Sequence, residues 1–294
     1  MSKFFRTFAP FFKKMNAMKK ILFVLPLVAL LFSCKSKDEP AQQHAVTFHV
    51  PGLAVETQPM NAPAVRRTPV LTDDDGQQMT DLIVWDGSTY LLRQQNTDPD
   101  FGTITLMLTT GAHHLHFIAT RSTGLSIDEG VLYCTSLRPT FGKHYDIDVT
   151  GSSDNNVSLD RLTGQVVITI EDEVPTGANE LRIQFGDYYK GINPGDFSAV
   201  RSGDFDQTVS ISGKVGSSNN EYKVNVLAPV YGTQSTTTFT LTATNAGGDI
   251  IGQATGTMPI CSNTKTLVHG NLFTGTRSFL SLSTSWGADS DVDF

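Results

Sequence analysis

The feature that most constrains the fold is an alternation of apolar and polar residues with a period of two, which recurs along most of the chain. In the stretch 102–110, Ile104, Leu106 and Leu108 fall on one side of an extended chain, and threonines fall on the other. This pattern is typical of a β-sheet with one buried face. The sequence therefore predicts strands rather than helices as the main elements.

Short strands separated by Gly, Pro, Asp and Ser are predicted throughout the first half of the chain. They cover residues 46–50, 82–85, 103–108, 115–119 and 144–149. A tight turn at Gly111-Ala112 predicts a hairpin between the third and fourth of them. No stretch between the strands is long or periodic enough for a helix, so the predicted fold class is all-β.

The stretch 150–156 consists of seven small or polar residues and is the predicted domain junction. Strands resume beyond it, at 165–171, 180–185, 222–227, 237–244, 250–257, 264–269 and 279–285. In the first of these, alternation directs Val166, Ile168 and Ile170 into one core. We expect one β-sandwich in residues 45–150 and a second in residues 151–294.

The charge of the chain argues against nucleic acid as a partner. The 294 residues carry 22 basic and 29 acidic side chains, but six of the basic ones lie in residues 1–33, which hold no acid. Without that segment the balance is 16 minus 29, or −13. A chain this acidic is repelled by phosphate backbones.

The N-terminal segment reads as an export signal. Two lysines precede an apolar run, Ile21 to Phe32, which is short of the roughly 20 residues of a spanning helix. The run ends in Leu-Phe-Ser-Cys, which resembles a bacterial lipobox with Cys34 as the lipidated residue. We expect a signal peptide at 1–33 and a lipidated tether at 34–44, and the alternative is a plain signal peptide with an incidental cysteine.

A basic residue and two acids, Lys37, Asp38 and Glu39, follow Cys34 closely. One interpretation is a solvated, flexible tether. The other rests on a resemblance to the surface-export signal of Bacteroidetes lipoproteins, which implies an outer-membrane protein that faces the outside of the cell.

Several motifs in order resemble the fimbrillin-like and fimbrial-anchor lipoproteins of Bacteroidetes. They are the lipobox with its Lys-Asp-Glu tail, Val-Thr-Phe-His-Val at 46–50, Met-Thr-Asp-Leu-Ile-Val-Trp-Asp-Gly at 79–87, the stretch 157–170, and 263–273 followed by Trp286. The resemblance implies two tandem transthyretin-like β-sandwiches and a role as fimbrial subunit, anchor or adhesin component. The chain lacks the early Cys-Pro pair of some anchor members, so stalk, anchor and tip roles stay open.

The same resemblance implies partners that bind by strand addition. In stalk subunits of the family, trypsin-like cleavage after an arginine releases the first strand, and a strand of a neighbouring subunit fills the groove. Arg66 and Arg67 lie in the Pro-rich stretch 56–78 and are the candidate cleavage site. An ordinary basic loop is the alternative interpretation of these two residues.

The sequence contains no recognisable motif of a catalytic, cofactor-binding or metal-binding site. Hydrolase, zinc-protease, dinucleotide and P-loop motifs are absent, so we expect no enzyme, no catalytic residue, no cofactor and no metal. The cluster at His113, His114 and His116 lacks further ligands, and the acidic runs at 73–75 and 289–293 lack EF-hand spacing. Cys134 and Cys261 could form a disulfide between the two halves, but packed free thiols are the favoured alternative.

A second function remains open, namely a glycan-binding surface lipoprotein of a carbohydrate-uptake system. Sugar binding requires two or three exposed aromatic faces close together. The candidate residues are Trp85, Trp286, Tyr188 and Tyr189. Their exposure therefore discriminates between the two functions.

Overall fold

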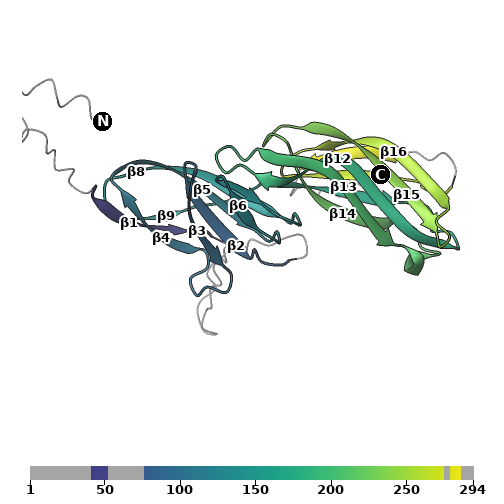
Figure 1. Ribbon diagram of the computed structural model, residues 1–294, viewed down its shortest axis with the longest axis horizontal. Helices are drawn as coiled ribbons and strands as arrows, with labels where there is room; N and C mark the ends of the chain where they lie inside the picture. The colour runs from purple at the N-terminus through teal and green to yellow at the C-terminus, as the bar shows by residue number, and fades with distance from the viewer. Residues whose placement is uncertain (1–40, 52–75, 275–278, 286–294) are drawn as a thin grey trace, which may run out of the picture. The chain divides into compact units, whose positions relative to one another are not determined.

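A computed structural model describes residues 41–51, 76–274 and 279–285 of the chain (Figure 1). Every described strand lies in one compact unit, which begins at Gln43. Apart from the short 3-10 helix η2 (Ser212–Lys214), the regular elements described are strands, which confirms the all-β prediction. No helix within the described ranges is long and apolar enough to cross a membrane.

Two sheets form the first half of the fold. One has three strands in the order β4 (Thr103–Thr109), β1 (Gln43–His49) and β9 (Ser153–Asn156). The other has five, in the order β10 (Asp160–Arg161), β8 (Thr140–Val149), β5 (Gly111–Thr120), β2 (Asp81–Asp86) and β3 (Thr89–Gln95). In the smaller sheet β1 is central, antiparallel to β4 and parallel to β9.

The apolar side chains that alternate along β4 form part of the core between these sheets. Ile104, Leu106 and Leu108 are buried, as predicted, and join Val46 and Phe48 of β1 in one apolar cluster. The Phe48 ring lies 5.3 Å from that of Phe117 on β5 and 5.7 Å from that of Tyr145 on β8, measured between centroids. Aromatic packing across the two sheets therefore fixes β1 in its sheet.

The second half also contains two sheets. One runs β14 (Asn220–Leu227), β11 (Thr163–Ile170), β17 (Thr264–Gly270) and β18 (Phe279–Ser285). The other runs β16 (Ile250–Ile260), β15 (Ser235–Asn245), β12 (Ala178–Ile192), β7 (Val131–Tyr133) and β6 (Ser126–Asp128), with β13 (Ala199–Ser210) also paired to β12. Val166, Ile168 and Ile170 of β11 are buried in the core of this half, as alternation predicts.

The predicted hairpin at Gly111-Ala112 is wrong. The chain does turn there, and Gly111 has φ +123°, a conformation that favours glycine. However, β4 pairs with β1, and β5 pairs with β2 and β8, so the turn carries the chain from one sheet to the other. The alternation of apolar and polar residues indicates which face of a strand is buried but not which strand it pairs with. A hairpin and a turn to the other sheet therefore give the same sequence pattern.

The stretch 150–156 contains a strand rather than only a linker. Its last four residues form β9, which pairs with β1, and β10 then pairs with β8, so the chain leaves the first two sheets after Arg161. Conversely, β6 and β7 come from the first half of the chain, and β7 pairs with β12 of the second half. The division into domains at residue 150 stays a prediction.

Candidate functional site

The position of β1 is the feature that best defines a candidate site. β1 lies between β4 and β9, so both of its edges are hydrogen-bonded within its own sheet (Figure 1). Its inward side chains, Val46 and Phe48, are fully buried. A strand in this position fills a slot that has unpaired backbone on both sides and an apolar floor whenever the strand is absent.

Polar side chains pin the outer face of β1 to β4. The hydroxyl of Thr47 lies 3.0 Å from that of Thr105, and Nδ1 of His49 lies 3.3 Å from the hydroxyl of Thr103. At the N-terminal end of the strand, His44 lies on the side of Val46 and Phe48 rather than on that of Thr47, and its Nε2 lies 3.1 Å from the hydroxyl of Thr110, the residue after β4. These cross-strand pairs run along the strand and reinforce the backbone register.

The sequence-predicted site residues lie outside the described part of the chain. This applies to the lipidation residue, the export signal and the cleavage site, that is, to Cys34, Lys37, Asp38, Glu39, Arg66 and Arg67. The roles assigned to them stay predictions. By sequence position, Arg66 and Arg67 fall between β1 and β2.

The histidine cluster is divided among three environments. His113 is nearly buried, with Nδ1 2.5 Å from Oδ2 of Asp86 and Nε2 2.8 Å from the carbonyl oxygen of Thr109. His114 is exposed and pairs with Asp146, while His116 is buried beside the ring of His144, at 4.8 Å between centroids. Within the described residues, no group of three His, Cys, Asp or Glu side chains is arranged to hold a metal.

The two buried histidines have opposite electrostatic settings. The hydrogen bond to Asp86, together with that to the Thr109 carbonyl, raises the pKa of His113. Burial, and secondarily the neighbouring His144, lower the pKa of His116. The surroundings of His113 therefore favour its charged form, which lies between two acceptors, and those of His116 favour its neutral form.

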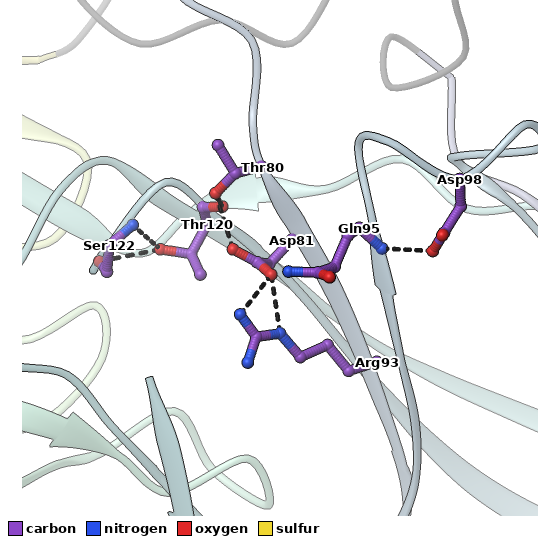
Figure 2. A network of polar contacts seen from close by, with 7 residues as sticks. All are labelled: Thr80, Asp81, Arg93, Gln95, Asp98, Thr120 and Ser122. Atoms are coloured by element: carbon purple, nitrogen blue, oxygen red, sulfur yellow. Dashed lines mark hydrogen bonds and ion pairs between the residues drawn. The ribbon is translucent and has the colours of Figure 1, made fainter. Parts of the chain in front are cut away.

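A buried polar network at the start of β2 was not predicted from the sequence. The buried carboxylate of Asp81 accepts hydrogen bonds from Nε of Arg93 on β3 and from the hydroxyl of Thr80, each at 2.7 Å. Figure 2 shows these groups, with Thr120 and Ser122 beyond them at the end of β5. The available signal was an acid directly before the apolar run Leu-Ile-Val-Trp, at a position that the sheet buries.

The contacts of this network point to a structural role rather than a catalytic one. The Ser122 hydroxyl is bonded to the hydroxyl of Thr120 and to the carbonyl of Arg138, and among the described residues no histidine or acid is its hydrogen-bond partner. Since a serine nucleophile requires an adjacent base, Ser122 is not activated. The network instead satisfies polar groups at the buried end of the sheet.

A cavity of about 10 Å³ lies next to this network and is lined by Thr120, Ser122 and Cys134, among others. This volume suits about one water molecule, not an organic ligand. Burial raises the pKa of the Cys134 thiol, which disfavours its reactive thiolate form. Cys134 and Cys261 are both free, so the disulfide considered from the sequence does not form.

The candidate aromatic residues do not form a sugar-binding platform. Trp85 is fully buried, and Tyr188 is also buried, which raises the pKa of its hydroxyl to about 12. Tyr189 is half-buried, and Trp286 lies outside the described residues. Of the described candidates, only Tyr189 is partly exposed, so these residues do not form the group of exposed aromatic faces that a glycan-binding site requires.

Comparisons with solved structures give matches of low sequence identity. A candidate adhesin from Bacteroides ovatus has a TM-score of 0.48 and 11% identity, over 76% of this chain and 86% of that chain. The fimbrial anchor protein from Porphyromonas gingivalis has a TM-score of 0.48 and 8% identity, over 83% of this chain and 98% of that chain.

A protein from Bacteroides thetaiotaomicron described as a candidate polysaccharide-binding protein has a TM-score of 0.44 and 10% identity, over 83% of this chain and 97% of that chain. No family model and no curated protein matches the chain. At these identities and TM-scores, the likeness says nothing about what this chain binds or assembles with.

Proposed function

We propose that the protein is a lipid-anchored outer-membrane protein, exposed on the cell surface, that serves as a fimbrial subunit, anchor or adhesin component. Its partners would be other fimbrial subunits, bound by addition of a β-strand, and it would need no cofactor and catalyse no reaction. The proposal combines the sequence resemblance with one structural observation, the central position of β1 in its sheet.

A central first strand suits strand exchange for a physical reason. Loss of β1 would unpair one edge of β4 and one edge of β9 and would open the apolar sites of Val46 and Phe48. A strand from a neighbouring subunit could satisfy all of these groups together. An edge strand, by contrast, would leave only one unpaired partner behind.

The location of Arg66-Arg67 supports the same mechanism. Cleavage there would break the covalent link between β1 and β2, so that β1 would be held by hydrogen bonds and side-chain packing alone. A competing strand could then replace it without passing a loop through the sheet. In a stalk role β1 would leave after the cut, whereas in an anchor or tip role it would stay.

Limited trypsin treatment of the intact protein tests this proposal. We expect a cut at Arg66 or Arg67, followed by concentration-dependent ladders on a native gel if the protein is a stalk-type subunit. The matched control is the Arg66→Gln, Arg67→Gln double variant, which should resist the cut and stay unassembled. If the protein is an anchor or tip, it should bind a single neighbouring subunit instead.

If the trypsin experiment contradicts the assembly role, glycan binding becomes the favoured function. A protein that is cut, remains monomeric at high concentration and binds no fimbrial subunit would exclude the assembly role. Binding to soluble polysaccharides on a glycan array, with loss on substitution of Tyr189 or Trp286, would then support the alternative.

A further inference from the structure

The outer edge of β4 lacks the features that usually protect an edge strand. β4 is the terminal strand of its sheet, and its sequence, Thr-Ile-Thr-Leu-Met-Leu-Thr, holds no charge, proline or glycine. Such strands are ready templates for pairing with another chain, and folded proteins usually protect them. Met107 at the middle of β4 is 58% exposed.

The other long edges whose side chains the structure describes have protective features. β13 carries Asp204 and Asp206, β14 carries Glu221 and Lys223, and β3 carries Arg93. β16 carries two glycines and Pro259. Charges and proline of this kind disfavour pairing with another strand, so among the edges whose side chains the structure describes β4 is the one best suited to it.

The register of β4 with β1 identifies which backbone groups point outward. Val50 N–H donates to the carbonyl of Gly102, and hydrogen-bonded pairs alternate along an antiparallel ladder. The backbone groups of Ile104, Leu106 and Leu108 therefore point toward β1. Those of Thr103, Thr105, Met107 and Thr109 point to the open edge.

Some of these outward groups are already bonded within the chain. Thr103 N–H donates to the carbonyl of Asp100, the Thr103 carbonyl accepts from Gln94, and the Thr109 carbonyl faces Nε2 of His113. Within the described residues, this leaves open both backbone groups of Thr105 and of Met107, at the middle of the strand, and the N–H of Thr109 at its end. Thr105 and Met107 lie on either side of Leu106.

We propose that the β4 edge pairs with β4 of a second copy of this chain, antiparallel and symmetric about Leu106. In that register Thr105 lies opposite Met107 of the second copy, and Met107 lies opposite its Thr105, so both backbone groups of Thr105 and of Met107 are satisfied in both strands. Shifting the register by two residues would direct part of this pairing at Thr103 or Thr109, whose carbonyls are already bonded. The register symmetric about Leu106 is thus the one that satisfies every backbone group of Thr105 and Met107.

The side chains of β4 agree with this pairing. The register places even-numbered residues opposite even-numbered ones, so the apolar side chains of both strands lie on the same side of the combined sheet. On the other side, exposed Met107 packs beside Thr105 of the second copy. No charges meet. The same symmetric pairing about Phe205 of β13 would oppose Asp204 with Asp206 and be repulsive.

The contact joins two three-stranded sheets into one and is a two-fold symmetric interface. One strand edge buries far less than the roughly 1,200 to 2,000 Å² of a stable complex, so the dimer forms reversibly and its population depends on concentration. It requires no cleavage and leaves β1 in place. It therefore goes beyond the strand exchange proposed above and is tested separately from it.

Sedimentation velocity of the uncut full chain over a wide concentration range tests the proposal. We expect a monomer–dimer equilibrium whose Kd rises about tenfold or more on Met107→Lys, because lysine on an edge strand blocks pairing. Thr105→Pro should have the same effect, since it removes an outward N–H and no backbone bond to β1; the hydroxyl contact with Thr47 is also lost, so circular dichroism must show that the variant is folded. Thr208→Lys, on the exposed edge strand β13, is the matched control and should leave Kd unchanged.

Hydrogen exchange provides the second measurement. The amides of Thr105 and Met107 should exchange rapidly in the dilute monomer and become protected as the concentration rises. A wild-type protein that stays monomeric, or one whose dimer is unaffected by both β4 variants while circular dichroism shows that each is folded, would overturn the proposal. Protection of both amides in the monomer would also overturn it, because the edge would then be covered by the chain itself.

Discussion

At the scale of single residues, His113 shows how one side chain joins the two sheets of the first half. Its ring, on β5, lies between Asp86 at the end of β2 and the Thr109 carbonyl at the end of β4. A ring nitrogen must carry a proton to donate to either acceptor, so both bonds form only in the charged imidazolium. Protonation thus links the end of β4 to the larger sheet.

We predict that His113→Gln destabilises the protein mainly at acidic pH. Because the pKa of His113 is raised above its ordinary value of 6.5, its contribution is fully present below about pH 6.5 and is lost as the pH rises through the folded-state pKa. Hydrogen bonds to charged groups contribute about 1.5–3 kcal/mol. Urea unfolding at pH 6 and at pH 9 should show a larger difference between wild type and variant at pH 6.

His114→Gln is the matched control for this prediction. His114 also faces a carboxylate, that of Asp146, but its side chain is 68% exposed, and exposed ion pairs contribute little. Its substitution should change stability by less than about 1 kcal/mol at either pH. Equal effects of the two variants, or a His113→Gln effect that grows with pH, would contradict the assignment.

At the scale of elements, the sequence predicts the strands that are buried on one face and misses those at edges. The alternation of β4 and β11 is uninterrupted, so their faces follow directly from the pattern. β13 was missed because it alternates charges with half-buried Phe205 and Val209, and it has a sheet partner on only one side. β12 runs beyond the predicted strand 180–185 because a bulge after Phe185 shifts its phase.

Pairing partners were less predictable than strands. The order β4-β1-β9 joins elements far apart in sequence, including the parallel pair of β1 and β9, and no local pattern encodes this choice. The candidate site shows the same limit. The residues of β1 were predicted as a strand, but its central position follows from long-range packing of Phe48 against β5 and β8.

We predict that Ile168→Asp unfolds the second half of the fold. Ile168 is fully buried on β11, between Tyr222 on β14 and Val268 on β17. The substitution loses about 1.5–3 kcal/mol of apolar burial and adds the cost of a buried, unpaired carboxylate, which together approach the whole stability of a typical domain. Circular dichroism and urea unfolding measure the effect.

Thr169→Lys is the control on the same strand. Thr169 lies on the other face of β11, beside Glu221 and His269, and is only partly buried. A lysine there should change stability by about 0.5 kcal/mol or less. A folded Ile168→Asp protein, or a Thr169→Lys protein that unfolds as readily, would count against the face assignment of β11.

At the scale of the whole molecule, the described unit begins at Gln43, nine residues after Cys34. A tether of this length would place the N-terminal end of β1 near an anchored lipid. We predict that Cys34→Ala releases the protein from membranes and abolishes labelling by palmitate, because the apolar run before it is too short to span a bilayer. Membrane fractionation measures the release.

The export signal provides the control for this experiment. Substituting Lys37, Asp38 and Glu39 by alanine should leave palmitate labelling intact and remove accessibility to external protease on whole cells. A Cys34→Ala protein that stays membrane-bound and labelled would refute the lipid anchor. Unchanged surface proteolysis of the triple variant would refute the export signal alone.

The central position of β1 also has a consequence in terms of mass action. In the intact chain β1 is present at an effective concentration set by its own connection, so folding is unimolecular. After a cut between β1 and β2, the same strand becomes a ligand of the remaining protein, and the folded state is stabilised only as far as the free strand concentration exceeds its dissociation constant. On the Met107→Lys background, which blocks the β4 contact, the melting temperature of the cut protein should then rise with protein concentration, whereas that of the intact chain should not.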